Sequence, residues 1–599
     1  MADARILKRN EVLKENTWAV EDIFPSDQAW NEEYEALKAL PEKAAAFKGT
    51  LGRSAADLLA YFKQRDEIAY RMGLLFNYAS RNADVDTGNG FYQDMRNKAM
   101  SLMVAVESAA AYATPEILAI EDSVLEGFFT AEPELDIYRR PISKLRHQKD
   151  HTLTPAEEAL LASAGEIAKA PDSIGSSFRN ADMRFPSVQD SKDNTLPLTQ
   201  ESLVAWLRST DRILRQNAFE TFYQTLYGWR NSIATTLDAQ FRQLKFFSKA
   251  RKYNTTLEAA LDKTEVPTAV YHSLIEAVHN NMDKMHRYMA LRKKLMGLDE
   301  LHMYDLYPPI VKEASAEIPF EQAKDTVMEA LQVLGEDYTA ILKEGFENRW
   351  IDVYENEGKR GGAYSAGGFP HPYVLLNHKN DLGSMFTLAH EMGHALHSYY
   401  SCKNQPLCTS NYVIFVAEVA STCNEVLMIQ HLLNKTTDKT QRAYLVNHFL
   451  EKFRTTLYRQ TMFAEFELFM GKCCEAGQTL TADLLCKEYH RLNQLYYGDN
   501  AVIDQGIAME WARIPHFYYN YYVFQYATGF SAAIAIAMRI LKEGAPAVED
   551  YKKFLSSGGS QDPISLLKIA GVDMASPKPV EQALELFGQL LDEMEQLVG

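Results

Sequence analysis

Two histidines four residues apart, with a glutamate after the first, are the side chains in this sequence best suited to chemistry. The segment 381–401 reads DLGSMFTLAHEMGHALHSYYS and has the apolar spacing of a helix, with Asp381 placed to cap its start. Residues four apart share one face of a helix, so His390 and His394 can present both imidazoles to one tetrahedral zinc ion. Glu391 is offset from that point and would reach a metal-bound water. This HExxH pattern is a known metallopeptidase motif, and it predicts that Glu391 is a general base.

A catalytic zinc needs a third protein ligand and an open coordination position. A third histidine six residues after the second would be one solution, but Tyr400 occupies that position. The segment 411–433 has a helical, largely apolar pattern and carries Glu418 and Glu425 two turns apart. A buried carboxylate without a partner is costly, so we predict that Glu418 ligates zinc. We predict that Glu425 accepts a hydrogen bond from a ligand imidazole, with a plain structural ion pair as the alternative.

His397 follows His394 by one turn. It is either a second group supporting the ligands or a hydrogen-bonded core histidine, and we favour the core histidine.

The rest of the chain is predicted to be mainly α. Long stretches rich in Ala, Leu, Glu, Lys and Met have apolar residues three and four apart, and Pro and Gly collect between them. The segment 184–198 predicts a hairpin, and 349–377 predicts a small antiparallel sheet immediately before the metal motif. A chain of 599 residues is expected to form more than one lobe. We place an N-terminal helical lobe at 1–199 and a catalytic domain at 200–599.

Composition narrows the class of protein. The formal net charge of −18 argues against a nucleic-acid partner, which requires a basic footprint. Six cysteines without CxxC spacing indicate a reducing compartment rather than a disulfide framework. The charged N-terminus is unlike a secretory signal, and no run of about 18 uncharged apolar residues predicts a membrane span. We therefore expect a cytoplasmic protein without a membrane partner; the sequence leaves monomer or homo-oligomer open.

HEMGH, followed after 23 residues by EVAST, resembles the thimet oligopeptidase-like zinc peptidases, and most closely the oligoendopeptidase F branch. The resemblance extends from WAVEDIFPS near the start to the last helices, and includes IPHFYYNYYVFQYATGFSAA. It implies two helical lobes that enclose a deep substrate channel, with a small β-sheet beside one zinc ion per chain. It also implies hydrolysis of internal bonds in short unfolded peptides.

The stretch IPHFYYNYYVFQYATG has a histidine among several tyrosines. Clustered tyrosines usually form an aromatic core or interface. Family relatives carry a histidine and tyrosines here, and by that resemblance His516 and Tyr522 are the expected donors to the oxyanion. Tyr526 and Tyr519 are expected substrate contacts. Tyr521 stays an alternative to Tyr522, because the register is uncertain by one residue.

The glycine-rich loop 359–373 is expected to supply a strand edge on which an extended peptide can pair. We predict Gly362, Ala363 and Tyr364 as substrate-binding residues. An ordinary mobile surface loop is the alternative.

Two other functions remain open at the level of sequence. A zinc carboxypeptidase or dipeptidyl carboxypeptidase on the same scaffold would need a cation for the terminal carboxylate of the substrate, for which Arg513 and Lys359 are candidates. A non-catalytic peptide-binding protein with structural zinc is disfavoured, because such zinc usually has four protein ligands.

Overall fold

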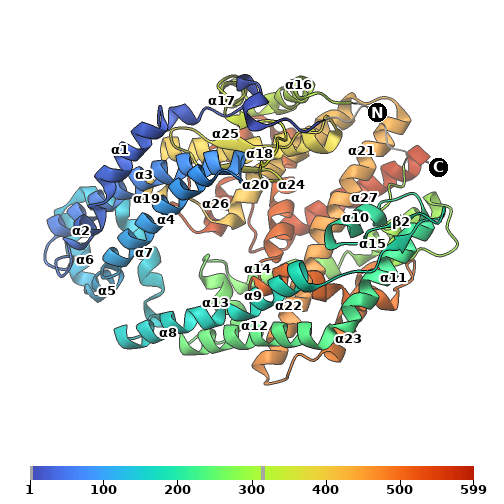
Figure 1. Cartoon of the computed structure of the whole chain (residues 1–599), viewed down its shortest axis with the longest axis horizontal. Coiled ribbons are helices and arrows are strands. Elements are labelled where there is room, and N and C mark those ends of the chain that lie inside the picture. Colours follow the sequence, from blue (N-terminus) through green and yellow to red (C-terminus); the bar gives the residue numbers. More distant parts are fainter. Residues whose placement is uncertain (1–4, 312–316, 599) are drawn as a thin grey trace. The chain divides into compact units, whose positions relative to one another are not determined.

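The computed structural model describes residues 5–311 and 317–598 (Figure 1). Helices make up 72% of the chain and strands only 2%, which confirms the predicted mainly α fold. The chain forms two compact units, each made of three sequence segments. Unit 1 consists of Met1–Asp150, Ser315–Met428 and Ile536–Gly571, and unit 2 consists of His151–Ala314, Ile429–Ala535 and Val572–Gly599. The division into 1–199 and 200–599 and the channel between lobes stay predictions.

The helices of unit 1 come from both halves of the sequence. They are α1 (Asp27–Leu37), α2 (Leu40–Ala45), α3 (Ala55–Val85), α4 (Gly90–Ala110), α5 (Ala113–Ala119), α6 (Asp122–Ala131), α7 (Arg139–His147), α16 (Phe320–Ala330), α17 (Glu336–Glu347), α18 (Leu382–Asn404), α19 (Leu407–Ser410), α25 (Ala545–Leu555) and α26 (Pro563–Ile569). Two further helices, α20 (Ile414–Lys435) and α24 (Phe524–Glu543), have residues in both units.

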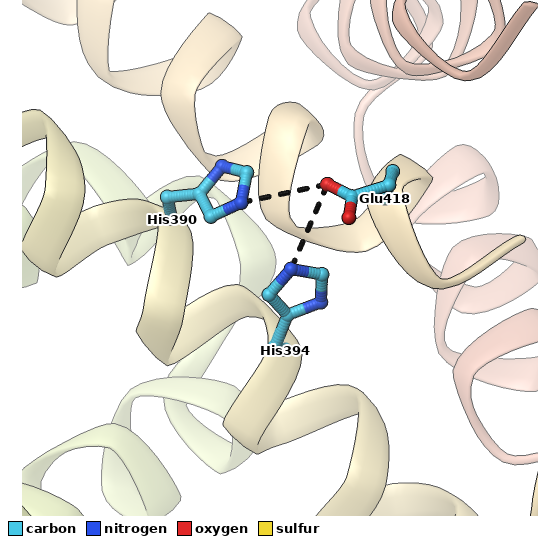
Figure 2. A group of neighbouring side chains, drawn as sticks. All are labelled: His390, His394 and Glu418. Atoms are coloured by element: carbon cyan, nitrogen blue, oxygen red, sulfur yellow. Dashed lines mark ion pairs between the residues drawn. The ribbon is translucent and has the colours of Figure 1, made fainter. Parts of the chain in front are cut away.

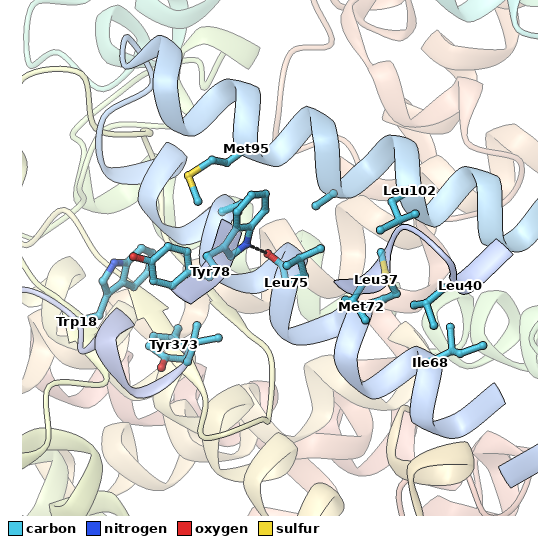
Figure 3. Packing of buried hydrophobic residues seen from close by; sticks show 14 of the residues in the cluster. Trp18, Leu37, Leu40, Ile68, Met72, Leu75, Tyr78, Met95, Leu102 and Tyr373 are labelled. Atoms are coloured by element: carbon cyan, nitrogen blue, oxygen red, sulfur yellow. Dashed lines mark hydrogen bonds between the residues drawn. The ribbon is translucent and has the colours of Figure 1, made fainter. Parts of the chain in front are cut away.

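One hydrophobic core of unit 1 forms where α3 and α4 pack side by side. Ile68, Met72 and Leu75 recur at helical spacing on α3 and are buried against Met95 and Leu102 of α4 (Figure 3). Tyr373, from the strand that precedes the metal motif, belongs to the same buried cluster. The core therefore ties the sheet to the longest helix of the unit.

A three-stranded sheet lies in unit 1, in the order β3 (Ile351–Asp352), β5 (Tyr373–Leu375) and β4 (Tyr364–Ala366). The predicted antiparallel pairing of its two outer sequence segments is wrong, because β3 pairs with β5 in parallel. The 353–372 connection is long enough for the crossover that parallel strands need. It also supplies β4, which pairs antiparallel with β5 and contacts α18. The predicted small sheet next to the motif helix is thus present, with a different topology.

Unit 2 is also helical and contains the predicted hairpin, β1 (Val188–Gln189) with β2 (Thr195–Leu196), in antiparallel pairing. Within it, α12 packs against α9 and α22, and α27 packs against α14 and α21. Its helices are α8 (Pro155–Ala168), α9 (Ala170–Ser177), α10 (Gln200–Leu207), α11 (Arg212–Gly228), α12 (Arg230–Ala250), α13 (Thr256–Asp262), α14 (Thr268–His279), α15 (Met282–Leu295), α21 (Lys439–Lys452), α22 (Arg459–Glu475), α23 (Ala482–Tyr497) and α27 (Lys578–Val598).

Two helical stretches of the described chain, Gly90–Ala119 and Phe524–Glu543, are long and apolar enough by composition alone to cross a membrane. In the second, 67% of the apolar window is buried, as in the core helix of a globular protein. The absence of a membrane partner stays a prediction.

Candidate active site

The helix α18 carries the HExxH motif. The carboxylate of Asp381 accepts a hydrogen bond from the backbone N–H of Ser384 at 2.7 Å and caps the first turn. One helical turn separates His390 from His394, whose ring centroids lie 4.8 Å apart. The helix therefore brings both imidazoles to one side, as their spacing requires.

Glu418, near the start of α20, lies beside these two histidines (Figure 2). Its Oε2 lies 3.5 Å from Nε2 of His390 and 3.7 Å from Nε2 of His394. Ligand atoms on one tetrahedral zinc ion are roughly 3.3–3.5 Å apart; both Glu418 contacts are close to this spacing, and the candidate ligand atoms of all three residues lie within 4.8 Å of one another. All three are partly exposed, as an open catalytic site needs.

A glycine in the motif explains how α20 comes so near to α18. A Cβ built on Gly393 would lie 2.6 Å from Cα of Ser421 and 2.9 Å from the carbonyl oxygen of Ala420. The backbone of α20 thus lies directly on α18 at this point, and Asn424 donates a hydrogen bond to the carbonyl of Ala389 at 3.2 Å. This close packing positions Glu418 over the histidines.

The two histidines have different electrostatic surroundings. Nδ1 of His390 lies 2.6 Å from Oε1 of Glu425. Burial opposes a charge on His390, but Glu425, together with the charges of Glu391 and Glu418, raises the pKa of the ring. Burial and the neighbouring His390 lower the pKa of His394 to about 3, so His394 is neutral, the form in which imidazole binds metals. Glu425 therefore lies where it can orient the imidazole ring of His390.

Glu391 is buried beside this group. Burial raises its pKa to about 7; the charge of His390 opposes that rise, and Glu418 adds to it. The backbone of Ser365, in β4, faces this carboxylate and lowers its pKa. A carboxyl group with a pKa near neutrality can both accept and return a proton.

A cavity of about 1020 Å³ opens onto these side chains, entirely within unit 1. The face of α3 from Arg65 to Asn77 lines it, together with the loop 363–369, α18 and the start of α20. The rings of Tyr70 and Phe369 meet edge-on within this lining, 5.5 Å apart. The cavity has ample volume for several residues of a peptide.

The predicted substrate-binding loop borders this cavity in part. Ala363 and Tyr364 line it, whereas Gly362 is not among its lining residues, and the Gly362 carbonyl accepts a hydrogen bond from Asn377 at 2.8 Å. The Tyr364 hydroxyl donates to Asp84 at 2.6 Å, which fixes that side chain. In the described chain β4 pairs with β5 alone, so it is an edge strand of the sheet.

His397 belongs to the core, as we favoured, but among the residues that the structure describes its Nδ1 has no hydrogen-bond partner, so the predicted hydrogen bond is not found there. It is buried and stacks on Tyr412, with ring centroids 3.7 Å apart, while Phe554 lies on another side. Burial lowers its pKa to about 3, so it is a neutral packing residue.

A second group of predicted site residues forms a cluster in unit 2. His516 lies with its ring centroid 5.5 Å from Tyr519, 6.2 Å from Tyr522 and 5.8 Å from Tyr526. Its Nε2 is 3.3 Å from the Tyr526 hydroxyl. All four side chains are at least partly exposed, and burial lowers the pKa of His516. We call these four residues the His516 cluster.

The intervening tyrosines point elsewhere. Tyr521 is buried, and its hydroxyl lies 2.8 Å from Oγ1 of Thr256. The hydroxyl of Tyr518 lies 2.7 Å from Oγ1 of Thr236. Tyr521 is therefore buried, whereas Tyr522 is partly exposed.

Both cations considered as carboxylate anchors are bound to internal carboxylates. The Lys359 ammonium is fully buried and lies 2.7 Å from Asp352. The Arg513 guanidinium lies 2.8 Å from Glu510, which also binds Arg459. Both side chains are thus ion-paired within the protein.

Sequence reasoning did not identify Gly393 or Ser365 as part of the site. A glycine inside a helix is unfavourable by about 1 kcal/mol relative to alanine, so Gly393 was a readable signal of close packing. The contribution of Ser365 is its backbone, which no side-chain pattern reveals.

Comparisons with known proteins agree with this geometry. A family model described as Peptidase family M3 matches residues 205–586, and one described as Oligopeptidase F matches residues 116–185. The chain is 48% identical to Oligopeptidase PepF of Bacillus subtilis, over 98% of this chain and 88% of the relative. It is 37% identical to the chromosomal Oligoendopeptidase F of Lactococcus lactis subsp. cremoris, over 99% of both chains. The crystal structure of oligoendopeptidase-F from Enterococcus faecium superposes with a TM-score of 0.75 at 37% identity, covering 96% of this chain and 99% of that one.

Proposed function

Because the chain belongs to peptidase family M3 and is a metallopeptidase acting on oligopeptides, we propose that it is a zinc endopeptidase that cleaves internal bonds of short unfolded peptides. One observation carries the proposal. Oε2 of Glu418 lies 3.5 Å from Nε2 of His390 and 3.7 Å from Nε2 of His394. The buried Glu391 lies beside them, and all four side chains line the cavity of about 1020 Å³.

We propose His390, His394 and Glu418 as the ligands of one zinc ion per chain, with Glu425 orienting His390. When bound, zinc would supply a Lewis acid for the attacking water and the scissile carbonyl. Glu391 takes the proton of the attacking water and passes it to the leaving nitrogen. A dication nearby would lower the pKa of this carboxyl below its metal-free value, which keeps it ionised and basic at neutral pH.

The substrate is proposed to lie extended along β4. Backbone groups of Ala363 and Tyr364 on this edge can pair with any peptide, which gives affinity with little sequence preference. His516 and Tyr522 are proposed to donate hydrogen bonds to the developing oxyanion, and Tyr519 and Tyr526 to contact the substrate.

The carboxypeptidase alternative receives no support from its two candidate anchors, since Lys359 and Arg513 are both paired internally. Cleavage of a fluorogenic peptide blocked at both ends decides the matter. We expect such a peptide to be cut internally at a rate close to that of its unblocked form. A requirement for a free terminal carboxylate would contradict the endopeptidase proposal.

The metal proposal has its own test. Dialysis against a chelator should abolish cleavage, and one equivalent of zinc per chain, measured by elemental analysis, should restore it. Full activity of the metal-free protein would contradict the mechanism.

We also propose a cytoplasmic location. All six cysteines are free thiols, which suits a reducing compartment. Cell fractionation tests this, and recovery in the culture medium would contradict it.

A further inference from the structure

The backbone that presents the His516 cluster is unusual. A short 3₁₀ turn ends at Tyr518, and the next helix, α24, begins only at Phe524. Between them Asn520 and Tyr521 have φ angles of 55° and 61°. Two consecutive non-glycine residues in the left-handed region are unfavourable, so surrounding groups must hold this turn in place.

A glutamate on α22 holds it from within the core of unit 2. Glu467 is completely buried, and its Oε1 accepts the backbone N–H of Tyr521 at 3.0 Å. The backbone of Val523 also faces this carboxyl group and lowers its pKa. Tyr521 and Val523 flank Tyr522 in the sequence, so one side chain acts on the main chain on both sides of it.

Other contacts fix the neighbouring side chains and the start of the turn. The amide of Gln240 donates to the carbonyl of Tyr518 at 3.0 Å and to Oδ1 of Asn520 at 2.9 Å. Thr256 binds the Tyr521 hydroxyl. None of these contacts reaches the N–H groups at the end of the turn.

Glu467 acts as an uncharged hydrogen-bond acceptor rather than as a charged carboxylate. Burial raises its pKa to about 8, and the backbone of Tyr521 and Val523 offsets this only in part. Among the residues that the structure describes, its Oε2 has no hydrogen-bond partner and no ion pair to it is found. An uncharged group with one well-placed oxygen, such as an amide, should therefore replace it.

We propose that Glu467 is a positioning residue of the active site, whose buried carboxyl group holds the Tyr521–Val523 main chain and thereby orients Tyr522. This inference rests on the proposed role of Tyr522. Glu467 itself is fully buried, so it is proposed to act through the turn.

The test compares Glu467→Leu, which keeps the volume without an acceptor, with Glu467→Gln, which keeps the acceptor without the acid. We expect Glu467→Leu to lower kcat about 10- to 100-fold, as misplaced catalytic groups do, with KM changed less than about threefold and metal content unchanged. Glu467→Gln should retain kcat within about threefold. Equal losses in both variants, or a Leu variant with normal kcat, would overturn the proposal.

A double-mutant cycle with Tyr522→Phe separates this proposal from the proposed function. If Glu467 acts through Tyr522, the Glu467→Leu/Tyr522→Phe double variant should be no slower than the slower single variant within about threefold. Multiplicative losses would overturn the inference while leaving the role of Tyr522 intact. Normal activity of Tyr522→Phe alone would instead reject the proposed function of Tyr522.

Hydrogen exchange of backbone amides tests the proposal without measuring catalysis. It uses the native protein and Glu467→Gln, so it does not depend on the folding of Glu467→Leu. The Tyr521 and Val523 amides should be protected in the native protein and in Glu467→Gln. Rapid exchange of both amides in the native protein would overturn the proposal.

Discussion

The metal group of unit 1 and the His516 cluster of unit 2 are positioned by different physical means. His390 and His394 are related by one turn of a regular helix, so their separation follows from helix geometry. The His516 cluster lies on an irregular turn with left-handed residues, held by side chains distant in sequence. A helix thus encodes the relation of His390 to His394 locally, whereas Glu418 and the turn depend on tertiary contacts.

The largest expected effect comes from removing a ligand of the regular site. His390→Ala should lose its metal and at least about 10⁴-fold of its activity, because two ligands cannot hold a catalytic zinc ion. Metal content is measured by elemental analysis after gel filtration. One tightly held equivalent of zinc in this variant would remove His390 from the ligand set.

Glu391→Gln should leave the ligands in place and remove only the base. We expect a decrease in kcat of about 10²–10⁴-fold, with stoichiometric metal and unchanged thermal stability. Normal turnover would show that another group accepts the proton.

Two adjacent tyrosines of the turn, Tyr521 and Tyr522, should differ in their effect on catalysis. Tyr522→Phe should lower kcat about 10- to 10³-fold if its hydroxyl stabilises the oxyanion. Tyr521→Phe removes only the buried contact to Thr256 and should cost about 1 kcal/mol of stability with little change in kcat. Steady-state kinetics and thermal unfolding of both variants test the register, and reversed kinetic effects would assign the role to Tyr521.

These differences explain how far the sequence could predict the site. The spacing of His390, Glu391 and His394 on a helix needs no tertiary information, and the charge of Glu418 on an apolar helix indicated a partner. The choice between Tyr521 and Tyr522 could not be made, because the positive φ angles at 520 and 521 break the helical register. The parallel pairing of β3 with β5 was also missed, since strand direction depends on the path of the connecting loop.

A smaller effect is expected from removing Glu425, the carboxylate beside Nδ1 of His390. Glu425→Ala removes the carboxylate 2.6 Å from Nδ1 of His390 and should weaken zinc affinity about 10- to 100-fold. Competition with a chromophoric chelator measures the affinity, with kcat at saturating zinc falling less. Unchanged affinity would reduce Glu425 to a structural ion pair.

Each region also relies on a glycine at a close approach, and the two glycines should differ in effect. A Cβ on Gly393 would meet the backbone of Ser421 at 2.6 Å. Backbone cannot rotate away, so Gly393→Ala should cost about 1–3 kcal/mol and reduce metal content by displacing Glu418. A Cβ on Gly471 would overlap the hydroxyl of Tyr521, a buried side chain held by Thr256, so Gly471→Ala should destabilise the turn but keep its metal.

Gly383→Ala is the matched control, because a Cβ there meets only Oδ1 of Asp381 at an ordinary 3.5 Å. It lies on the same helix as Gly393 and should leave metal content unchanged. Thermal unfolding and metal analysis of the three variants compare the regions directly. If Gly471→Ala lost metal while Gly393→Ala kept it, the close helix contact would not be what positions Glu418, and the metal group would depend on the same kind of distant support as the turn.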